Sequence, residues 1–166
     1  MNILKSFILV FVLAVTGCAS NQTSQKEITS TKPALTLSQE DAWNILIGKW
    51  YGSQPTKEGG YKQEIMERFP EGTYKITFRV YDKNGQAKEQ TEVGHWGVSG
   101  PIYFTIFRGW LKDGQVSSSN PADPYNSDTY KIIQLNDKTF EYENFSSGNK
   151  YAIKKVSDDF SFPEHN

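Results

Sequence analysis

From residue 49 onward the sequence alternates between apolar and polar side chains in short runs, and most runs end in a turn signal. Residues 73–81 show the pattern most clearly, because Tyr74, Ile76 and Phe78 alternate with charged or polar residues. Successive side chains of a strand point to opposite faces, so this alternation is typical of strands with one buried face. The pattern predicts eight strands, at residues 49–53, 60–69, 73–81, 88–98, 102–111, 129–135, 139–145 and 151–156.

Tight turns separate most of these strands. Asn84-Gly85 is the strongest short-range hairpin signal, and Pro70-Glu71-Gly72 and Ser99-Gly100-Pro101 end two further runs. Aromatic residues make up 14% of the chain, and they suit the pleated surface of a sheet. We therefore predict an all-β domain whose eight antiparallel strands run up and down and close into a barrel, since closure leaves no exposed edge.

A short helix is predicted just before the first strand. Ser38 is a favourable N-cap, and Glu40 and Asp41 lie in the first turn, where the helix dipole favours acids. Asp41 stands where a capping box prefers Glu or Gln, so the box is imperfect. The helix is expected to end at Gly48 and to plug one end of the barrel.

Residues 1–17 have the features of a secretory signal peptide. Lys5 supplies positive charge, and residues 7–15 form an apolar segment of about nine residues, too short to span a bilayer. Val15-Thr16-Gly17-Cys18 resembles the bacterial lipobox, in which an aliphatic residue and two small ones precede a cysteine. The resemblance implies cleavage before Cys18, diacylation of its thiol, and acylation of the new amino terminus by a fatty acid such as palmitate.

This anchor predicts how the chain is organised and where it resides. Several acyl chains attach a protein stably to a membrane, whereas one chain does so only marginally. We expect a signal peptide at 1–17, the lipidated Cys18 and a polar tether at 18–37, and the barrel domain at 38–166. Ala19 is not the Asp that usually retains Gram-negative lipoproteins in the inner membrane. The outer membrane, facing the periplasm, is the expected location; in a Gram-positive envelope the domain would lie outside the plasma membrane.

Charge and cysteine content argue against several function classes. The net charge is −1, and losing Lys5 makes it about −2, which argues against a nucleic-acid partner. Cys18 is the only cysteine, so its lipidation leaves no thiol for a disulfide or a thiolate metal site. Residues 112–128 carry oxygen ligands at a spacing that matches no Ca²⁺ motif. We predict no metal and no cofactor, and the alternative role for this long connection is a lid.

Two short motifs resemble those of the lipocalins. Gly48-Lys49-Trp50 resembles their Gly-x-Trp opening, and residues 94–100 are similar to the Gly-x-Trp-x-Val-x-Gly hairpin of small bacterial lipocalin-like domains. The resemblance covers about residues 38–157 and implies a lipocalin-like barrel. Two features depart from the family: residues 127–130 match its Thr-Asp-Tyr loop only loosely, and Lys154 and Lys155 stand where a late Arg usually packs on the opening Trp.

A barrel of eight strands is either filled by its side chains or holds one small ligand. Arg108 interrupts an apolar run, and a buried guanidinium needs a partner such as Glu92 or Glu67. Our hypothesis is an amphipathic ligand whose anionic or carbonyl head meets Arg108. The predicted ligand contacts are Arg108, Tyr74, Trp96, Tyr130, Tyr142 and Glu92.

The alternation of apolar and polar residues also predicts which side chains of the other strands point into the barrel. Those of the second strand are Tyr61, Ile65, Glu67 and Phe69; those of the fifth are Ile102, Phe104, Ile106, Arg108 and Trp110; those of the later strands are Tyr130, Ile132, Gln134, Phe140, Tyr142, Asn144, Tyr151 and Ile153.

Two other functions stay open. A filled barrel would serve as a structural module or dock on another envelope protein, and then Arg108 would form an internal salt bridge or reach water. An enzyme is the least favoured reading, because His95 stands alone in a Gly-rich strand beside no nucleophile motif. We therefore expect a membrane-anchored protein that binds a small amphipathic molecule and has no catalytic residues.

Overall fold

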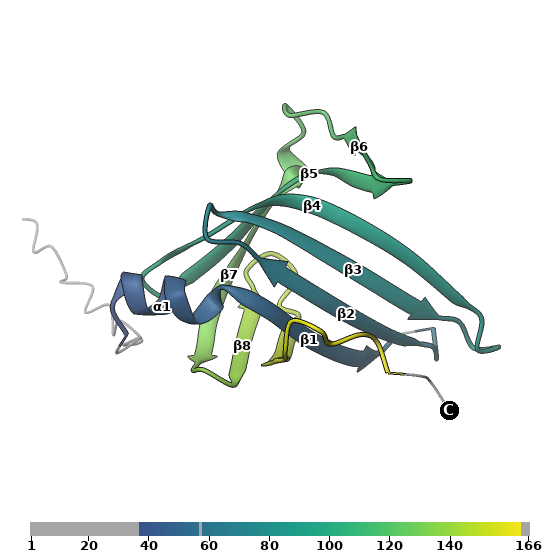
Figure 1. Cartoon of the computed structure of the whole chain (residues 1–166), viewed down its shortest axis with the longest axis horizontal. Coiled ribbons are helices and arrows are strands. Elements are labelled where there is room, and N and C mark those ends of the chain that lie inside the picture. Colours follow the sequence, from purple (N-terminus) through teal and green to yellow (C-terminus); the bar gives the residue numbers. More distant parts are fainter. Residues whose placement is uncertain (1–36, 57, 164–166) are drawn as a thin grey trace, which may run out of the picture. The chain divides into compact units, whose positions relative to one another are not determined.

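The computed structural model describes residues 37–56 and 58–163, which lie in one compact unit. Eight of its strands form a closed antiparallel barrel, and each strand pairs with its neighbours in the ring (Figure 1). Pairing of β1 with β9 and of β4 with β5 completes the ring. The elements are α1 (Gln39–Leu46), β1 (Gly48–Pro55), β2 (Tyr61–Arg68), β3 (Thr73–Tyr81), β4 (Ala87–Ser99), β5 (Ile102–Lys112), β6 (Gln115–Ser118), the 3₁₀ turn η1 (Pro124–Asn126), β7 (Ser127–Leu135), β8 (Thr139–Asn144) and β9 (Lys150–Lys155).

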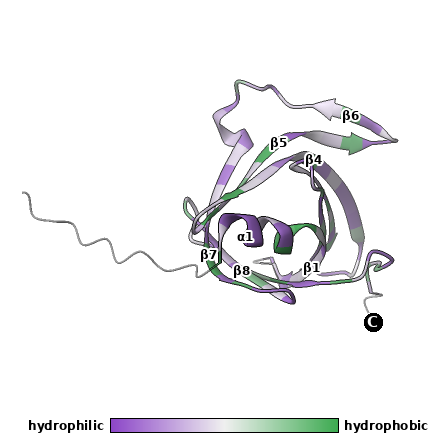
Figure 2. Cartoon of the chain, turned by 60° about the vertical axis from the view of Figure 1, so that its left-hand side comes forward, coloured by the Kyte–Doolittle hydropathy of each residue, from purple (hydrophilic) through white to green (hydrophobic). Residues whose placement is uncertain are grey.

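The expected fold, an up-and-down barrel of eight strands after a short helix, is confirmed by this strand pairing. β6 was not expected. It forms a hairpin with the last residues of β5, outside the ring, within the segment that the sequence indicated as a long loop. Figure 2 shows β6 standing apart from the ring of strands, beside the end of β5.

Helix α1 begins and ends as its sequence predicts. The Ser38 hydroxyl accepts a 3.0 Å hydrogen bond from the Asp41 backbone N–H and donates one to the Asp41 carboxylate, so Asp41 completes the cap. The buried residues of α1 are Ala42 and Leu46, and its Trp43 ring stacks on Trp96 of β4 with centroids 4.2 Å apart. In Figure 2 the ring of strands surrounds the outline of α1. The helix therefore closes one end of the barrel.

The half of the barrel next to α1 is filled by large side chains. Trp50 is fully buried, and its indole N–H donates a 2.9 Å hydrogen bond to the Leu46 carbonyl at the end of the helix. Lys155 of β9 also contacts Trp50 and the helix. Its ammonium lies 5.4 Å from the Trp50 ring centroid and donates a 2.8 Å hydrogen bond to the Ile45 carbonyl. Lys155 thus packs on the opening Trp, where lipocalins usually have an arginine.

The C-terminal segment 156–163 packs on the outside of β1 and β2. Its Phe160 ring lies 5.1 Å from that of Tyr51, and the Lys49 ammonium donates hydrogen bonds to the carbonyls of Asp158 and Phe160. Ile65 of β2, buried to 8% exposure, lies beneath the same segment. This cover gives the outer face of β2 an apolar environment, so an apolar side chain of β2 can face outward while its charged side chains face the barrel interior.

The predicted signal peptide, Cys18 and nearly all of the predicted tether lie outside the described residues, so those assignments stay predictions. None of the helices in the described part of the chain is both long and apolar enough to cross a bilayer.

Candidate functional site

A cavity of about 300 Å³ occupies the half of the barrel away from α1. The pairing register of β1 and β2 shows which residues of β2 lie at the cavity end of the barrel and which lie at the helix end. Lys62 and Glu64 pair with the far end of β1, whereas Arg68 pairs with Gly48, next to the helix. The cavity lining is unusually rich in tyrosine, and it consists of Lys62, Glu64, Met66, Tyr74, Ile76, Phe78, Glu92, Tyr103, Thr105, Phe107, Trp110, Tyr125, Asn126, Asp128, Tyr130, Tyr142 and Tyr151.

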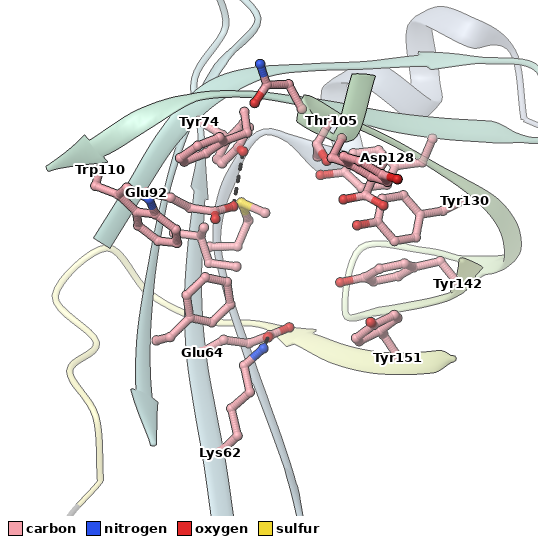
Figure 3. Close-up of a pocket in the computed structure, with 17 residues that line it drawn as sticks. Lys62, Glu64, Tyr74, Glu92, Thr105, Trp110, Asp128, Tyr130, Tyr142 and Tyr151 are labelled. Atoms are coloured by element: carbon pink, nitrogen blue, oxygen red, sulfur yellow. Dashed lines mark hydrogen bonds and ion pairs between the residues drawn. The ribbon is translucent and has the colours of Figure 1, made fainter. Parts of the chain in front are cut away.

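One wall of the cavity is a ladder of tyrosines from β7, β8 and β9. Tyr142 stacks on Tyr151 with centroids 5.1 Å apart and meets Tyr130 edge-on at 5.2 Å. Figure 3 shows the hydroxyls of Tyr130 and Tyr142 directed across the cavity toward the wall that carries Glu92. Burial is the main cause that raises the pKa of both phenols, and nearby acids raise it further. The ladder therefore stays neutral at physiological pH. It presents ring edges and hydroxyls to the cavity, because Phe140 and Tyr151 stack on the two faces of the Tyr142 ring.

The opposite wall carries Glu92 on β4 and Tyr74 on β3. The Tyr74 hydroxyl donates a 3.1 Å hydrogen bond to Glu92 (Figure 3). Gly94 makes this geometry possible, because a Cβ there would lie 2.7 Å from the Tyr74 ring. Burial raises the pKa of Glu92; the Tyr74 hydrogen bond and Lys62 lower it, and Asp128 and Glu64 raise it. Glu92 is thus a carboxylate held partly out of water with a single phenol as its partner.

Lys62 and Glu64, both on β2, line the same side of the cavity. The Lys62 ammonium lies 3.3 Å from a Glu64 carboxylate oxygen and 4.0 Å from the centroid of the Phe78 ring. An ammonium group in a protein favours two kinds of partner, a carboxylate and the face of an aromatic ring. This pair leaves Glu92 and Asp128 as the cavity carboxylates that form no ion pair with a described residue.

The mouth of the cavity is built by the connection between β5 and β7. Tyr125 of η1 is 90% exposed and Trp110 of β5 is 37% exposed, and both line the cavity. Asn126 is held by a hydrogen bond from its amide to the Asn120 carbonyl, and the Asn144 amide donates to Asp128 at 3.0 Å. The segment that the sequence marked as a long loop therefore supplies residues to the rim.

The floor of the cavity separates it from the filled half. Tyr103 is 1% exposed, and its hydroxyl accepts a 3.1 Å hydrogen bond from Nε of Arg68, which is equally buried. The guanidinium lies over the rings of Tyr103 and Phe140, with its carbon 4.8 Å and 5.5 Å from their centroids. Its two terminal nitrogens have no hydrogen-bond partner among the described residues. Arg68 does not line the cavity, whereas Tyr103, whose ring and hydroxyl contact the guanidinium, does.

Four of the six predicted contact residues lie together in this cavity. Tyr74, Glu92, Tyr130 and Tyr142 come from four different strands and line one space. Trp96 faces inward as expected, but it lies at the helix end, stacked on Trp43, with its indole N–H bonded to the Phe69 carbonyl. It belongs to the filled half rather than to the cavity.

The placement of Arg108 inside the barrel is wrong. Its side chain is exposed, and the inward residues before it are Tyr103, Thr105 and Phe107. The register between β4 and β5 shifts at this point: Gly94 pairs with Phe107 and Val93 with Gly109, so Arg108 is the extra residue of a β-bulge. A bulge reverses the alternation, which is why Trp110 lines the cavity although Ile102, Phe104 and Ile106 do not.

The orientation expected for β2 is also reversed. Its inward residues are Lys62, Glu64, Met66 and Arg68, whereas Ile65 and Glu67 lie on the outer face next to the C-terminal segment. Alternation suggested that the apolar residues would face inward, but the C-terminal segment buries the apolar outer face instead. On β7 a second bulge, at Ile133, leaves Gln134 exposed rather than inward.

Sequence reasoning therefore missed Lys62, Tyr103, Thr105 and Phe107 as cavity residues, and it named Glu64 only as one of several scattered acids. The polar sequence of β2 was the available signal, since Lys62, Glu64 and Arg68 recur at every second or fourth position. His95, the lone histidine of the strands, is exposed. No group of three or more His, Cys, Asp or Glu in residues 37–56 and 58–163 is arranged to hold a metal ion.

No family model and no curated protein matches this chain. Among solved structures, it is similar to a lipocalin-like protein from Bacteroides uniformis, with 20% sequence identity and a TM-score of 0.41, over 68% of this chain and 99% of that one. It is also similar to an uncharacterized protein from Bacteroides eggerthii, with 17% identity and a TM-score of 0.39, over 66% and 98% of the two chains. The barrel described above rests on this chain's own strand pairing.

Proposed function

We propose that this protein binds a small amphipathic molecule inside its barrel, in the cavity between Glu92 and the tyrosine ladder. The observation that carries the proposal is the division of the interior: large side chains fill the half next to α1, while the other half encloses about 300 Å³. Ligand pockets in proteins begin at about this volume. Their usual lining, aromatic side chains with a few polar groups that orient the ligand, is also the lining here.

The tyrosines favour a ligand over a purely structural interior. A barrel that only needs to be stable can fill its lumen with aliphatic side chains, which have no polar atoms to satisfy. Here six tyrosines and three carboxylates surround an unfilled space. The polar tips of tyrosine provide hydrogen bonds to a ligand while their rings supply apolar contact.

We also propose that the barrel is tethered to the cell envelope through a lipid on Cys18. The support is the lipobox-like sequence around Cys18 and the apolar segment before it. Metabolic labelling with a palmitate analogue tests this directly. The full chain is expected to take up the label and to fractionate with membranes, whereas Cys18→Ser is expected to lose both properties; an unlabelled full chain would contradict the anchor.

Native mass spectrometry tests the binding function. The full chain carrying Cys18→Ser, secreted from a bacterial host, is expected to retain a small molecule. Thr105→Phe introduces a ring into the cavity wall and should abolish retention, whereas Thr129→Phe makes the same change on the exposed face of β7 and should not. If no added mass is found and the parent chain shows no saturable binding of an apolar dye, the barrel acts through its exterior, and a protein partner becomes the better function.

A further inference from the structure

The cavity contains more negative than positive charge. Glu64, Glu92 and Asp128 line it against one cation, Lys62, and that cation is paired with Glu64. Glu92 accepts a hydrogen bond from Tyr74, and Asp128 accepts one from Asn144, but neither forms an ion pair with a described residue. Glu92 faces this partly dry space and Asp128 lies exposed beside it, and together they favour a ligand that brings positive charge.

Lys62 shows how this interior accommodates an ammonium group. Its Nζ lies 4.0 Å from the Phe78 ring centroid and 3.3 Å from Glu64, so it combines a cation–π contact with an ion pair. Glu92 supplies a second carboxylate, and the hydroxyls and ring edges of Tyr130 and Tyr142 face it from the opposite wall. That second set holds no cation of the described chain.

Tyr142 gives independent evidence for a ligand. The residue is 6% exposed, and its hydroxyl forms no hydrogen bond within residues 37–56 and 58–163. Figure 3 shows this hydroxyl directed into the cavity. The hydroxyl opens into the cavity, so a ligand that donates a hydrogen bond there would give it a partner.

We infer that the ligand is a compact organic cation, a protonated amine or a quaternary ammonium, with its charge near Glu92 and its apolar body against Tyr130 and Tyr142. This inference rests on the binding function proposed above and specifies the ligand's charge. It replaces the anionic head group expected from Arg108, because that arginine lies outside the barrel. The described residues offer no group of three or more His, Cys, Asp or Glu arranged to hold a metal ion, and the aromatic lining suits an organic cation.

Arg68 identifies the rival ligand class. Its terminal nitrogens are buried without partners, and a carboxylate reaching them would satisfy both. Such a group would have to pass Glu64 and Glu92 and displace Tyr103, whose ring and hydroxyl cover the guanidinium. The route is therefore unfavourable for an anion, and binding of a carboxylate is the outcome that would overturn the inference.

The test compares three probes that share one phenyl ring and a short chain: 2-phenylethylamine, 2-phenylethanol and 3-phenylpropionate. Isothermal titration calorimetry on the full chain carrying Cys18→Ser measures their affinities at pH 7. The amine should bind at least about tenfold more tightly than the alcohol, as expected for a charge-assisted contact, and the carboxylate should bind most weakly.

Two matched variants assign the charge preference to Glu92. Glu92→Gln keeps an acceptor for Tyr74 but removes the charge, so the amine should lose its advantage while the alcohol is unaffected. Glu89→Gln makes the same change on the outer face of β4, where Glu89 pairs with Arg79, and should leave all three affinities unchanged.

Each contrary result has a separate meaning. Equal or tighter binding of the alcohol or the carboxylate overturns the cationic ligand but leaves the proposed binding function intact. If carboxylate binding is also lost in Arg68→Met, the floor arginine is the anchor. Failure of all three probes to bind saturably overturns the inference and contradicts the binding function as well.

Discussion

Nε of Arg68 donates a 3.1 Å hydrogen bond to the hydroxyl of Tyr103, and this contact links the filled half of the barrel to the floor of its cavity. Both residues are almost completely buried, and the two terminal nitrogens of Arg68 have no partner among the described residues. The guanidinium is held chiefly by the rings of Tyr103 and Phe140.

This contact predicts that Tyr103→Phe destabilises the barrel by about 1–3 kcal/mol, because it removes the hydrogen bond that Arg68 makes in the barrel interior. Arg68→Met should be close to neutral or stabilising, since a buried charge without an ion partner is replaced by an apolar chain of similar length. Urea unfolding measures both. In the Arg68→Met background, Tyr103→Phe should cost much less; an equal cost in both backgrounds would show that the hydrogen bond contributes nothing.

Glu92 predicts an unusual dependence of stability on pH. Its pKa in the fold is raised, chiefly by burial, above the ordinary value of 4.5. The fold therefore favours the protonated acid: this contribution to stability is fully present below pH 4.5 and is lost as the pH rises through the raised pKa. The groups facing Glu92 are Tyr74 on β3, Lys62 and Glu64 on β2, and Asp128 on β7.

Consequently, Glu92→Gln should unfold at higher urea concentration than the parent at pH 7, and the difference should shrink toward pH 4. The measurement is urea unfolding at a series of pH values. Glu89→Gln, on the exposed face of the same strand, serves as the control. A loss of stability in Glu92→Gln at pH 7 would mean that the carboxylate has a stronger partner than Tyr74.

Lys155 predicts a stabilising role for the cation at the closed end of the barrel. Lys155→Met keeps most of the apolar contact with Trp50 but removes the hydrogen bond to the Ile45 carbonyl, so we expect a loss of about 0.5–1.5 kcal/mol. Lys154→Met, one residue earlier on the exposed face of β9, should change stability by less than about 0.5 kcal/mol. Thermal unfolding of both variants separates the two sites, and equal losses would contradict the assigned contact.

The C-terminal segment predicts a stability contribution from outside the barrel. Phe160→Ala removes a partly buried ring from Tyr51, and the loss should be about 1–2 kcal/mol. Phe145→Ala makes the same change at a ring that is 59% exposed and should cost less than about 0.5 kcal/mol. Urea unfolding compares the two. If Phe160→Ala is as mild as Phe145→Ala, the segment does not stabilise the sheet beneath it.

Local sequence signals were sufficient for the elements themselves. The N-cap at Ser38, the hairpin at Asn84-Gly85 and strand positions within a few residues all follow from side-chain chemistry and backbone preference over a few positions. Alternation also predicted the inward faces of β3, β8 and β9, because there one face is apolar and meets only the core. With the inward positions expected for Tyr130 of β7 and Glu92 of β4, this prediction placed Tyr74, Tyr130, Tyr142 and Glu92 in one cavity.

Other features depended on contacts between distant segments. Arg108 points outward because a bulge against β4 inserts one residue into β5, and β2 turns its charged residues inward because the C-terminal segment covers its apolar outer face. Sequence alone thus determined the eight barrel strands to within a few residues and that they form an antiparallel barrel. Only the tertiary structure decided that Lys62 and Glu64 face the lumen and that Arg108 does not, because a strand's orientation depends on what buries each of its faces, and those partners lie far away in the chain.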